Sequence, residues 1–152
     1  MKSLQETTKD IVRQHYARAG IAASILSALA EAGKDVQRLT PADLAPVDQF
    51  HVRGRAATLE LARVAGIDAS MRVLDVGCGI GGTTRGLAAE FGCHVTGIDL
   101  TDEYCRAAVL LSERVGLSDR VGFRQADATR LPFEAGSFDL VWTEHVAMNI
   151  AD

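Results

Sequence analysis

The chain has 152 residues, of which 47% are hydrophobic and 24% are charged, and its formal net charge is −4. These values are typical of one globular domain, and they argue against a basic surface for nucleic acid or for an anionic membrane. The three cysteines are an odd number without C-x-x-C spacing, and no signal peptide is visible, so we expect reduced thiols in a cytoplasmic protein without a membrane partner.

The first part of the chain is predicted to be helical. Apolar residues recur at helical spacing in 6–17 and again in 21–33, where Gly33 ends the pattern. The segment 40–46 begins with Thr-Pro-Ala-Asp, a typical helix start, and its proline at position 46 is expected to stop that helix. Residues 1–55 lack any strand pattern, and we interpret them as an N-terminal helical extension or lid.

Strands and helices alternate in the remainder of the chain, residues 56–152. A helix at 57–64 has Ala57, Leu61 and Val64 on one face and ends at Gly66. Strands are expected at 71–76, 94–99, 121–126 and 138–142, with helices at 83–91 and from Thr101 or Asp102 to 115 between the first three. This alternation predicts an α/β fold with a Rossmann-like, mainly parallel sheet.

A glycine-rich turn follows the first strand. The sequence Gly77-x-Gly79-x-x-Gly82 lets the backbone turn tightly and approach a ligand, and the helix after it offers free N–H groups. This pattern also matches the dinucleotide fingerprint. However, Asp75 lies two residues before the first glycine, where a carboxylate would repel a pyrophosphate. A ligand with a cationic amino group and no phosphate fits better.

Acidic and polar residues follow the ends of all four strands, at the edge where open α/β sheets bind their ligands. Asp75 and Asp99 end the first two strands, Asp127 follows the third, and Thr143-Glu144-His145 follows the fourth. Asp99 lies 20 residues after Gly79, a spacing that suits a carboxylate accepting both ribose hydroxyls. A turn role for Asp127 and a structural role for His145 remain alternatives. The histidines do not have metal-ligand spacing, so no metal is expected.

The segment Val73-Leu-Asp-Val-Gly-Cys-Gly79 resembles the first motif of the class I S-adenosylmethionine-dependent methyltransferases. The resemblance implies that the chain binds S-adenosylmethionine and releases S-adenosylhomocysteine, that Asp99 is the ribose acid, and that the segment 126–128 lies beside the adenine. The cofactor-binding residues that we expect are Asp75, Gly77, Cys78, Gly79, Asp99, Leu100, Ala126, Asp127, Ala128 and Thr143.

Two further segments, 39–58 and 144–149, resemble sarcosine/dimethylglycine-type and related small-molecule methyltransferases. In such enzymes N-terminal helices cover the cofactor and help to shape the acceptor pocket. The resemblance makes Tyr16, Gln49, Phe50, His51 and Glu144 candidates for the lid or the acceptor site, although core packing explains Tyr16 and Phe50 equally well. If the acceptor needs a general base, His145 is the best local candidate, because the reference pKa of histidine lies near neutrality.

The expected function is methyl transfer from S-adenosylmethionine to an N, O or C nucleophile of a small molecule. The family fold has seven strands, whereas this chain supplies four in the order 3-2-1-4, so we expect a piece of a longer enzyme, truncated after the fourth strand. The exposed edge of that strand is a possible route to a homo-oligomer. Two alternatives remain open, an NAD-dependent oxidoreductase and a non-catalytic cofactor-binding or assembly module.

Overall fold

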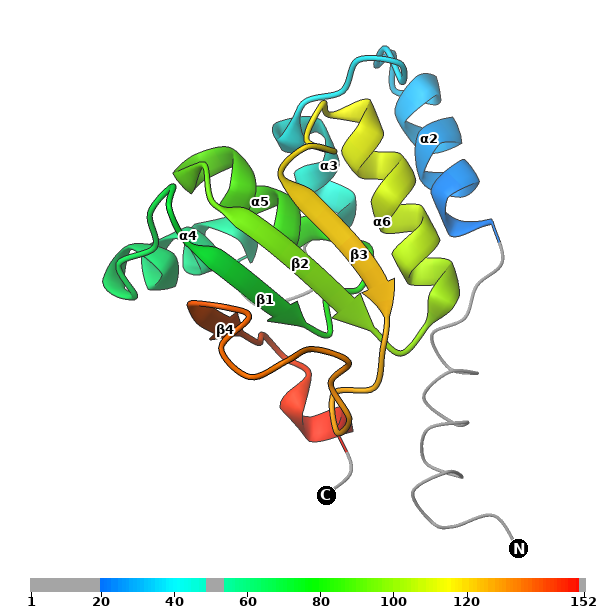
Figure 1. Cartoon of the computed structure of the whole chain (residues 1–152). Helices are drawn as coiled ribbons and strands as arrows, with labels where there is room; N and C mark the ends of the chain where they lie inside the picture. Colours follow the sequence, from blue (N-terminus) through cyan, green and yellow to red (C-terminus); the bar gives the residue numbers. More distant parts are fainter. Residues whose placement is uncertain (1–19, 49–53, 151–152) are drawn as a thin grey trace, which may run out of the picture.

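A four-stranded parallel sheet organises the chain (Figure 1). Its strands lie in the order β3-β2-β1-β4, and every pairing is parallel, with Val73 of β1 opposite Val95 of β2 and Leu140 of β4. The strand bounds are β1 Arg72–Val76, β2 His94–Asp99, β3 Val121–Gln125 and β4 Leu140–Trp142. The expected α/β fold and the order 3-2-1-4 are therefore confirmed.

The computed structural model describes residues 20–48 and 54–150. The helix expected at 6–17 and the lid candidates Tyr16, Gln49, Phe50 and His51 lie outside the described residues.

Helices α4 (Gly54–Val64), α5 (Gly82–Phe91) and α6 (Asp102–Arg114) lie behind the sheet in the view of Figure 1. Helix α2 (Ile21–Glu31) packs on α6, and α3 (Pro41–Asp48) packs on α5. Within the described part of the chain, no helix is long and apolar enough to cross a bilayer.

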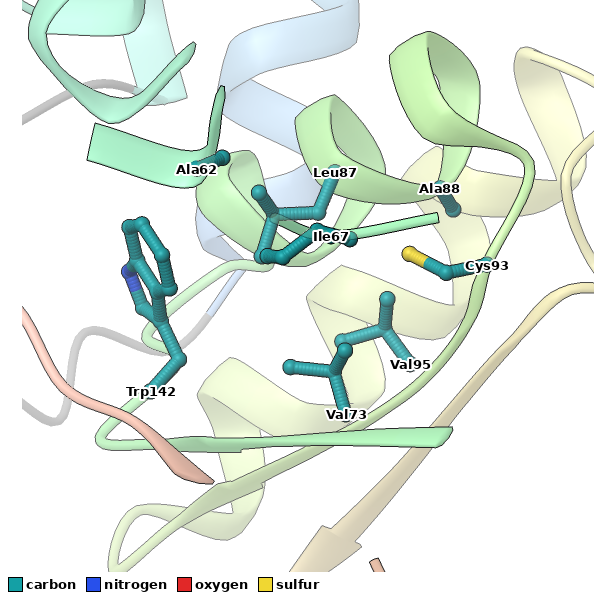
Figure 2. Close-up of a cluster of buried hydrophobic side chains, with 8 residues drawn as sticks. All are labelled: Ala62, Ile67, Val73, Leu87, Ala88, Cys93, Val95 and Trp142. Carbon is teal, nitrogen blue, oxygen red and sulfur yellow. The ribbon is translucent and has the colours of Figure 1, made fainter. Parts of the chain in front are cut away.

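One core cluster fills the space between the sheet and helices α4 and α5. Figure 2 shows its buried side chains, which come from both helices, from three strands and from two loops: Ala62, Ile67, Val73, Leu87, Ala88, Cys93, Val95 and Trp142. The opposite face of the sheet carries Leu74, Val76 and Ile98, which are covered by the β3–β4 loop and Ile150.

The buried face of helix α4 is not the face that the spacing of its apolar residues predicts. Leu61 and Val64 are 51% and 82% exposed, whereas Thr58 and Ala62 are buried. Small side chains on the buried face let α4 approach the core that contains Trp142. Contacts with the rest of the fold therefore outweigh the apolar pattern of this helix.

Helix α3 begins as its sequence predicts but does not end there. The Thr40 N–H donates to Asp43 Oδ2 at 2.9 Å and the Asp43 N–H donates to Thr40 Oγ1 at 3.3 Å, which is a reciprocal cap. The expectation that Pro46 stops the helix is wrong, because α3 continues to Asp48. Leu44 is fully buried and Asp48 is also buried, so packing holds the helix despite the N–H that the proline lacks.

Two glycines of α5 should respond oppositely to alanine. A Cβ on Gly82 would lie 2.1 Å from the carbonyl oxygen of Asp48, whereas a Cβ on Gly86 would meet no atom within 4 Å. We expect Gly82→Ala to destabilise the protein by about 1–3 kcal/mol through overpacking. Gly86→Ala is the matched control and should add up to about 1 kcal/mol, because alanine favours helix. Urea unfolding measures both, and an equal effect of the two substitutions would contradict the close approach of α3.

Candidate functional site

The glycine turn between β1 and α5 is fixed to β2. Gly77 and Gly79 have φ values of 77° and 54°, in the left-handed region that glycine adopts without strain. The N–H groups of Gly77 and Cys78 both donate to the Ile98 carbonyl, at 2.8 and 2.9 Å. A Cβ on Gly79 would meet no atom within 4 Å, so the space beside that residue is open. At Gly79 the turn therefore presents its backbone to free space at the carboxyl ends of the strands, whereas the Val146 side chain fills the space beside Gly77.

Asp99, at the end of β2, lies against this turn. Its Oδ2 accepts from the Gly79 N–H at 3.0 Å and its Oδ1 accepts from the Thr101 N–H at 2.9 Å. Burial raises the pKa of Asp99, and the hydrogen bonds from Thr101 and Gly79 oppose that rise. A carboxylate has about four lone-pair sites, so both oxygens retain capacity for hydroxyl donors. The structure thus brings together Asp99 and Gly79, which the sequence spacing placed at one edge.

Asp75 is enclosed beneath the turn. Its Oδ2 accepts from Thr84 Oγ1 at 2.6 Å, and its side chain is buried. Burial raises its pKa to about 7, and the charges of Glu144 and Asp99 add to the rise. Because this carboxyl is buried, it would influence a ligand mainly through its field and through Thr84.

Glu144, which follows β4, is held by three donors from three elements. Its carboxylate accepts from Thr58 Oγ1 of α4 at 3.0 Å, from Thr83 Oγ1 of α5 at 3.1 Å and from Trp142 Nε1 of β4 at 3.1 Å. Glu144 was a candidate from the sequence, but these three donors were not predicted. The threonine pair that opens α5 is the signal that was available, because Thr83 and Thr84 each hold one of the two carboxyls.

The expected adenine-side residues lie beyond β2 and β3. Asp127 Oδ1 accepts from the N–H and Oγ1 of Thr129, at 3.0 and 2.7 Å, so the turn role considered for it is present. Ala126 and Ala128 pack on the Leu74 cluster of the second sheet face. The half-buried Leu100 accepts from Gln125 Nε2 through its carbonyl, at 3.0 Å.

The remaining candidates follow β4 and are exposed. Thr143 and His145 flank Glu144 in the loop. His145 has φ 54°, in the left-handed region that non-glycine residues seldom adopt. Such a conformation costs on the order of 1–3 kcal/mol and concentrates at functional sites. In the part of the chain that is described, no group of three metal-ligating side chains comes together.

The raised pKa of Asp75 makes its contribution to stability depend on pH. Its pKa is about 7 in the folded protein against an ordinary 3.8, so the folded state holds a proton between these values that the unfolded chain releases. The stabilisation from this bound proton is fully present below pH 3.8 and is lost as the pH rises through about 7. The parent should therefore lose stability as the pH rises from 5 to 8, whereas Asp75→Asn should not. Over this range we expect the unfolding free energy of Asp75→Asn to rise by at least about 1.4 kcal/mol relative to that of the parent, the equivalent of one pKa unit.

Urea unfolding at several pH values measures this difference. The control is Asp68→Asn, because the Asp68 carboxyl is exposed and its pKa is lowered by hydrogen bonds from Ser70. Its difference from the parent should stay flat between pH 5 and 8. A flat difference for Asp75→Asn as well would contradict the buried proton.

Comparison with known proteins places this geometry in a family. A family model described as a methyltransferase domain matches residues 73–152. The sterol 24-C-methyltransferase ERG6B of Gibberella zeae is 43% identical over 82 residues, which are 54% of this chain and 22% of that protein.

Two solved structures share the fold. Phosphoethanolamine N-methyltransferase 2 of Haemonchus contortus, in complex with phosphomonomethylethanolamine and S-adenosylhomocysteine, has a TM-score of 0.64 and 32% identity, over 69% of this chain and 24% of that one. The cyclase SpnF has a TM-score of 0.61 and 26% identity, over 86% of this chain and 47% of that one.

The matched region contains most of the site. It begins in β1 and includes the glycine turn, Asp75, Asp99 and Glu144, while Thr58 of α4 lies outside it. The chain spans less than half the length of each of the three proteins compared. Because the family model covers more than half of this chain, the chain belongs to the methyltransferase domain family.

Proposed function

We propose that this chain binds S-adenosylmethionine at the carboxyl ends of β1 and β2, as the cofactor-binding part of a small-molecule methyltransferase. Asp99 would accept the ribose hydroxyls, the Gly77–Gly79 turn would face the amino-acid end, and residues 126–128 would lie beside the adenine. The relative from Haemonchus contortus supports this proposal, because it was solved with S-adenosylhomocysteine bound.

The observation that carries the proposal is the sign of the charge around the turn. The charges that act most strongly on Asp75 are those of Glu144 and Asp99, and both are negative. Like charges in a partly buried site repel strongly, so a pyrophosphate would be disfavoured there. A sulfonium and an ammonium would instead be attracted. The same charges argue against the NAD-dependent oxidoreductase that the glycine fingerprint alone allows.

Methyl transfer needs little covalent chemistry from the chain. The sulfonium of the bound ligand supplies an activated methyl group, so the protein contributes alignment of the acceptor and exclusion of water. We assign to His145 the removal of a proton from an acceptor that carries one, because its side chain is exposed beside Glu144. The acceptor is a small molecule with an N, O or C nucleophile.

Calorimetry on the whole chain tests the cofactor. We expect S-adenosylhomocysteine to bind and NADH not to bind, and tighter binding of NADH would overturn the proposal. An assay of radiolabelled methyl transfer to a panel of amines, phenols and sterols then tests the activity. If the longest natural form of the protein binds the cofactor but transfers no methyl group, a non-catalytic module would be favoured. This outcome has to be tested because the chain also resembles the cyclase SpnF.

We also propose that two copies of the 152-residue chain associate through the edge of β4. Within the described chain β4 pairs only with β1, and Val141 on this strand is 61% exposed. Open edges with apolar side chains pair with other chains, and a lysine at the edge prevents it. Light scattering should show a dimer that Val141→Lys converts to monomer. Val64→Lys, on the exposed face of α4, is the control and should leave the dimer intact. A parent that stays monomeric at high concentration would contradict this proposal.

A further inference from the structure

One oxygen atom of Glu144 joins three elements of the fold. Its Oε2 accepts from Thr58 Oγ1 of α4 at 3.0 Å, from Thr83 Oγ1 of α5 at 3.1 Å and from Trp142 Nε1 of β4 at 3.1 Å. A carboxylate oxygen has about two lone pairs, so three donors already fill Oε2. This oxygen is therefore suited to connecting α4, α5 and β4, and not to binding a ligand.

The loop after β4 lies against both ends of the glycine turn. At the end of the turn that enters α5, Glu144 accepts from Thr83, the second residue of that helix. At the end that leaves β1, Val146 packs on Gly77 so closely that a Cβ on this glycine would lie 2.4 Å from Val146 Cγ2. A side chain at position 77 would therefore displace the loop. These two contacts fix the loop and the turn to each other.

His145 is held between the two anchors of this loop. Glu144 and Val146 are half-buried, whereas His145 between them is exposed. His145 has φ 54°, and a strained residue of this kind persists only where the surrounding structure holds it. The Asn149 N–H donates to the Val146 carbonyl at 2.8 Å and closes the turn that follows. The contacts of its neighbours therefore determine where the His145 side chain lies.

Helix α4 contributes a buried threonine to this arrangement. Thr58 is 1% exposed, and its hydroxyl lies 3.0 and 3.2 Å from the two oxygens of Glu144. The bond ties the helix that precedes the sheet to the loop that follows β4, across 86 residues of sequence. Thr58 also lies outside the region 73–152 that matches the family model, so this contact adds to what the match itself describes.

We propose that Glu144 is a positioning residue of the ligand site, which holds His145 and Val146 against the glycine turn and makes ligand affinity depend on Thr58 of α4. A change at Thr58 shifts the carboxylate, and the carboxylate shifts the loop that packs on Gly77. Ligand binding at the turn would affect α4 by the same path, because coupling between two sites is reciprocal. The part that concerns affinity rests on the proposed function, whereas the coupling of α4 to the turn does not.

A merely structural role for these bonds predicts a different result, which is lower stability with unchanged affinity in the folded molecules. Thr40 provides the matched control, because its hydroxyl also donates to a carboxylate, that of Asp43 at 2.7 Å. The neighbouring Leu39 N–H donates to the Arg114 carbonyl at the last residue of α6. Helix α6 begins after the carboxyl end of β2, so its last turn lies at the opposite edge of the sheet, away from the glycine turn.

Nuclear magnetic resonance on the whole chain tests the coupling without a ligand. Trp142 is the only tryptophan in the sequence, so its indole N–H gives one resonance. Glu144→Ala should move this resonance upfield, because the indole loses its acceptor. Thr58→Val should move it too, together with the Gly77 amide resonance, whereas Thr58→Ser keeps the hydroxyl and should leave both in place. Thr40→Val should also leave both in place. Unmoved Trp142 and Gly77 resonances in Thr58→Val would overturn the coupling.

Calorimetry then measures S-adenosylhomocysteine binding by the folded variants. We expect Glu144→Ala to weaken binding at least about fivefold, the lower end of usual coupling between sites, and Thr58→Val to give part of that loss. Adding Thr58→Val to Glu144→Ala should weaken binding no further, because both substitutions act through one carboxylate. If Glu144→Ala does not fold, Glu144→Gln takes its place, since it keeps the shape and one acceptor oxygen, and its effect should have the same direction.

The outcomes separate this inference from the proposed function. Parent affinity in the folded Glu144 variant would show a merely structural role and overturn the positioning. Losses that add in the double variant would show that Thr58 acts by another route, and they would overturn Glu144 as the link. If the parent itself does not bind S-adenosylhomocysteine, the proposed function fails, while the Gly77 resonance still decides whether α4 is coupled to the turn.

Discussion

Arg85→Ala is expected to lower the free energy of unfolding by about 3–5 kcal/mol, the usual cost of removing one partner of a buried ion pair. Arg85 Nη2 lies 2.7 Å from Asp48 Oδ2, and the two side chains are only 1% and 4% exposed. Arg85 Nη1 also donates to the Ala108 carbonyl and to Ser112 Oγ, both at 3.3 Å. One guanidinium therefore connects α3, α5 and α6, and its loss would leave the buried Asp48 carboxylate without its ion-pair partner, with only the charge of Arg55 still acting on it.

Urea unfolding measures the effect, and two further variants show whether burial is its cause. Arg106→Ala removes a surface cation that pairs with Asp102 at 2.9 Å, and it should cost no more than about 0.5 kcal/mol. The double variant Arg85→Met with Asp48→Leu removes both charges, and it should recover most of the stability, because apolar replacements of buried pairs are often neutral. A loss below about 1 kcal/mol for Arg85→Ala, typical of an exposed pair, would show that water reaches this ion pair.

Asp99→Ala is expected to weaken S-adenosylhomocysteine binding by at least about 10-fold, because each hydrogen bond to a charged group contributes about 1.5–3 kcal/mol. The substitution also removes the acceptor of the Gly79 and Thr101 N–H groups, so it loosens the turn. Asp99→Asn separates the two effects only in part. Its amide accepts through one oxygen, and its NH₂ group would face one of the two N–H donors.

Calorimetry on folded variants checks this result, and Asp68→Ala is the control. The Asp68 carboxylate also accepts from a backbone N–H two residues later, that of Ser70 at 2.8 Å. However, Asp68 precedes β1 and so lies at the amino ends of the strands, away from the proposed site. Its substitution should leave the affinity unchanged. An Asp99 variant that keeps its fold and the parent affinity would remove Asp99 from the site.

The local features of the site were predictable from the sequence. The end of β2 and the glycine turn after β1 follow from short patterns of apolar residues and glycine. The proximity of Asp99 to the turn follows from the geometry of parallel strands, because the carboxyl ends of neighbouring strands lie at one edge. These predictions needed only information within about 20 residues of the chain.

The supporting contacts were not predictable in the same way. Asp48 and Arg85 are 37 residues apart, and Thr58 and Glu144 are 86 apart. A charged residue with no partner nearby in sequence is ordinarily assigned to solvent, and no periodicity indicates that Arg85 is buried. The apolar residues of α4 were misleading for the same reason, because they lie on its exposed face. The buried face instead carries Thr58, whose hydroxyl is bonded to Glu144.

The close approach of α3 to α5 sets a rule for chimeric proteins. The Asp48 carbonyl occupies the place of a Cβ at position 82, and the Asp48 carboxylate meets Arg85 one turn further along α5. A helix from another family member could replace α3 only if its last turn brings a carboxylate to the same place. In a family member with any side chain at the position of Gly82, that side chain would collide with the Asp48 carbonyl, so α3 could not pack in the same place. The N-terminal helices and the glycine turn would therefore have to be exchanged together, as one cassette.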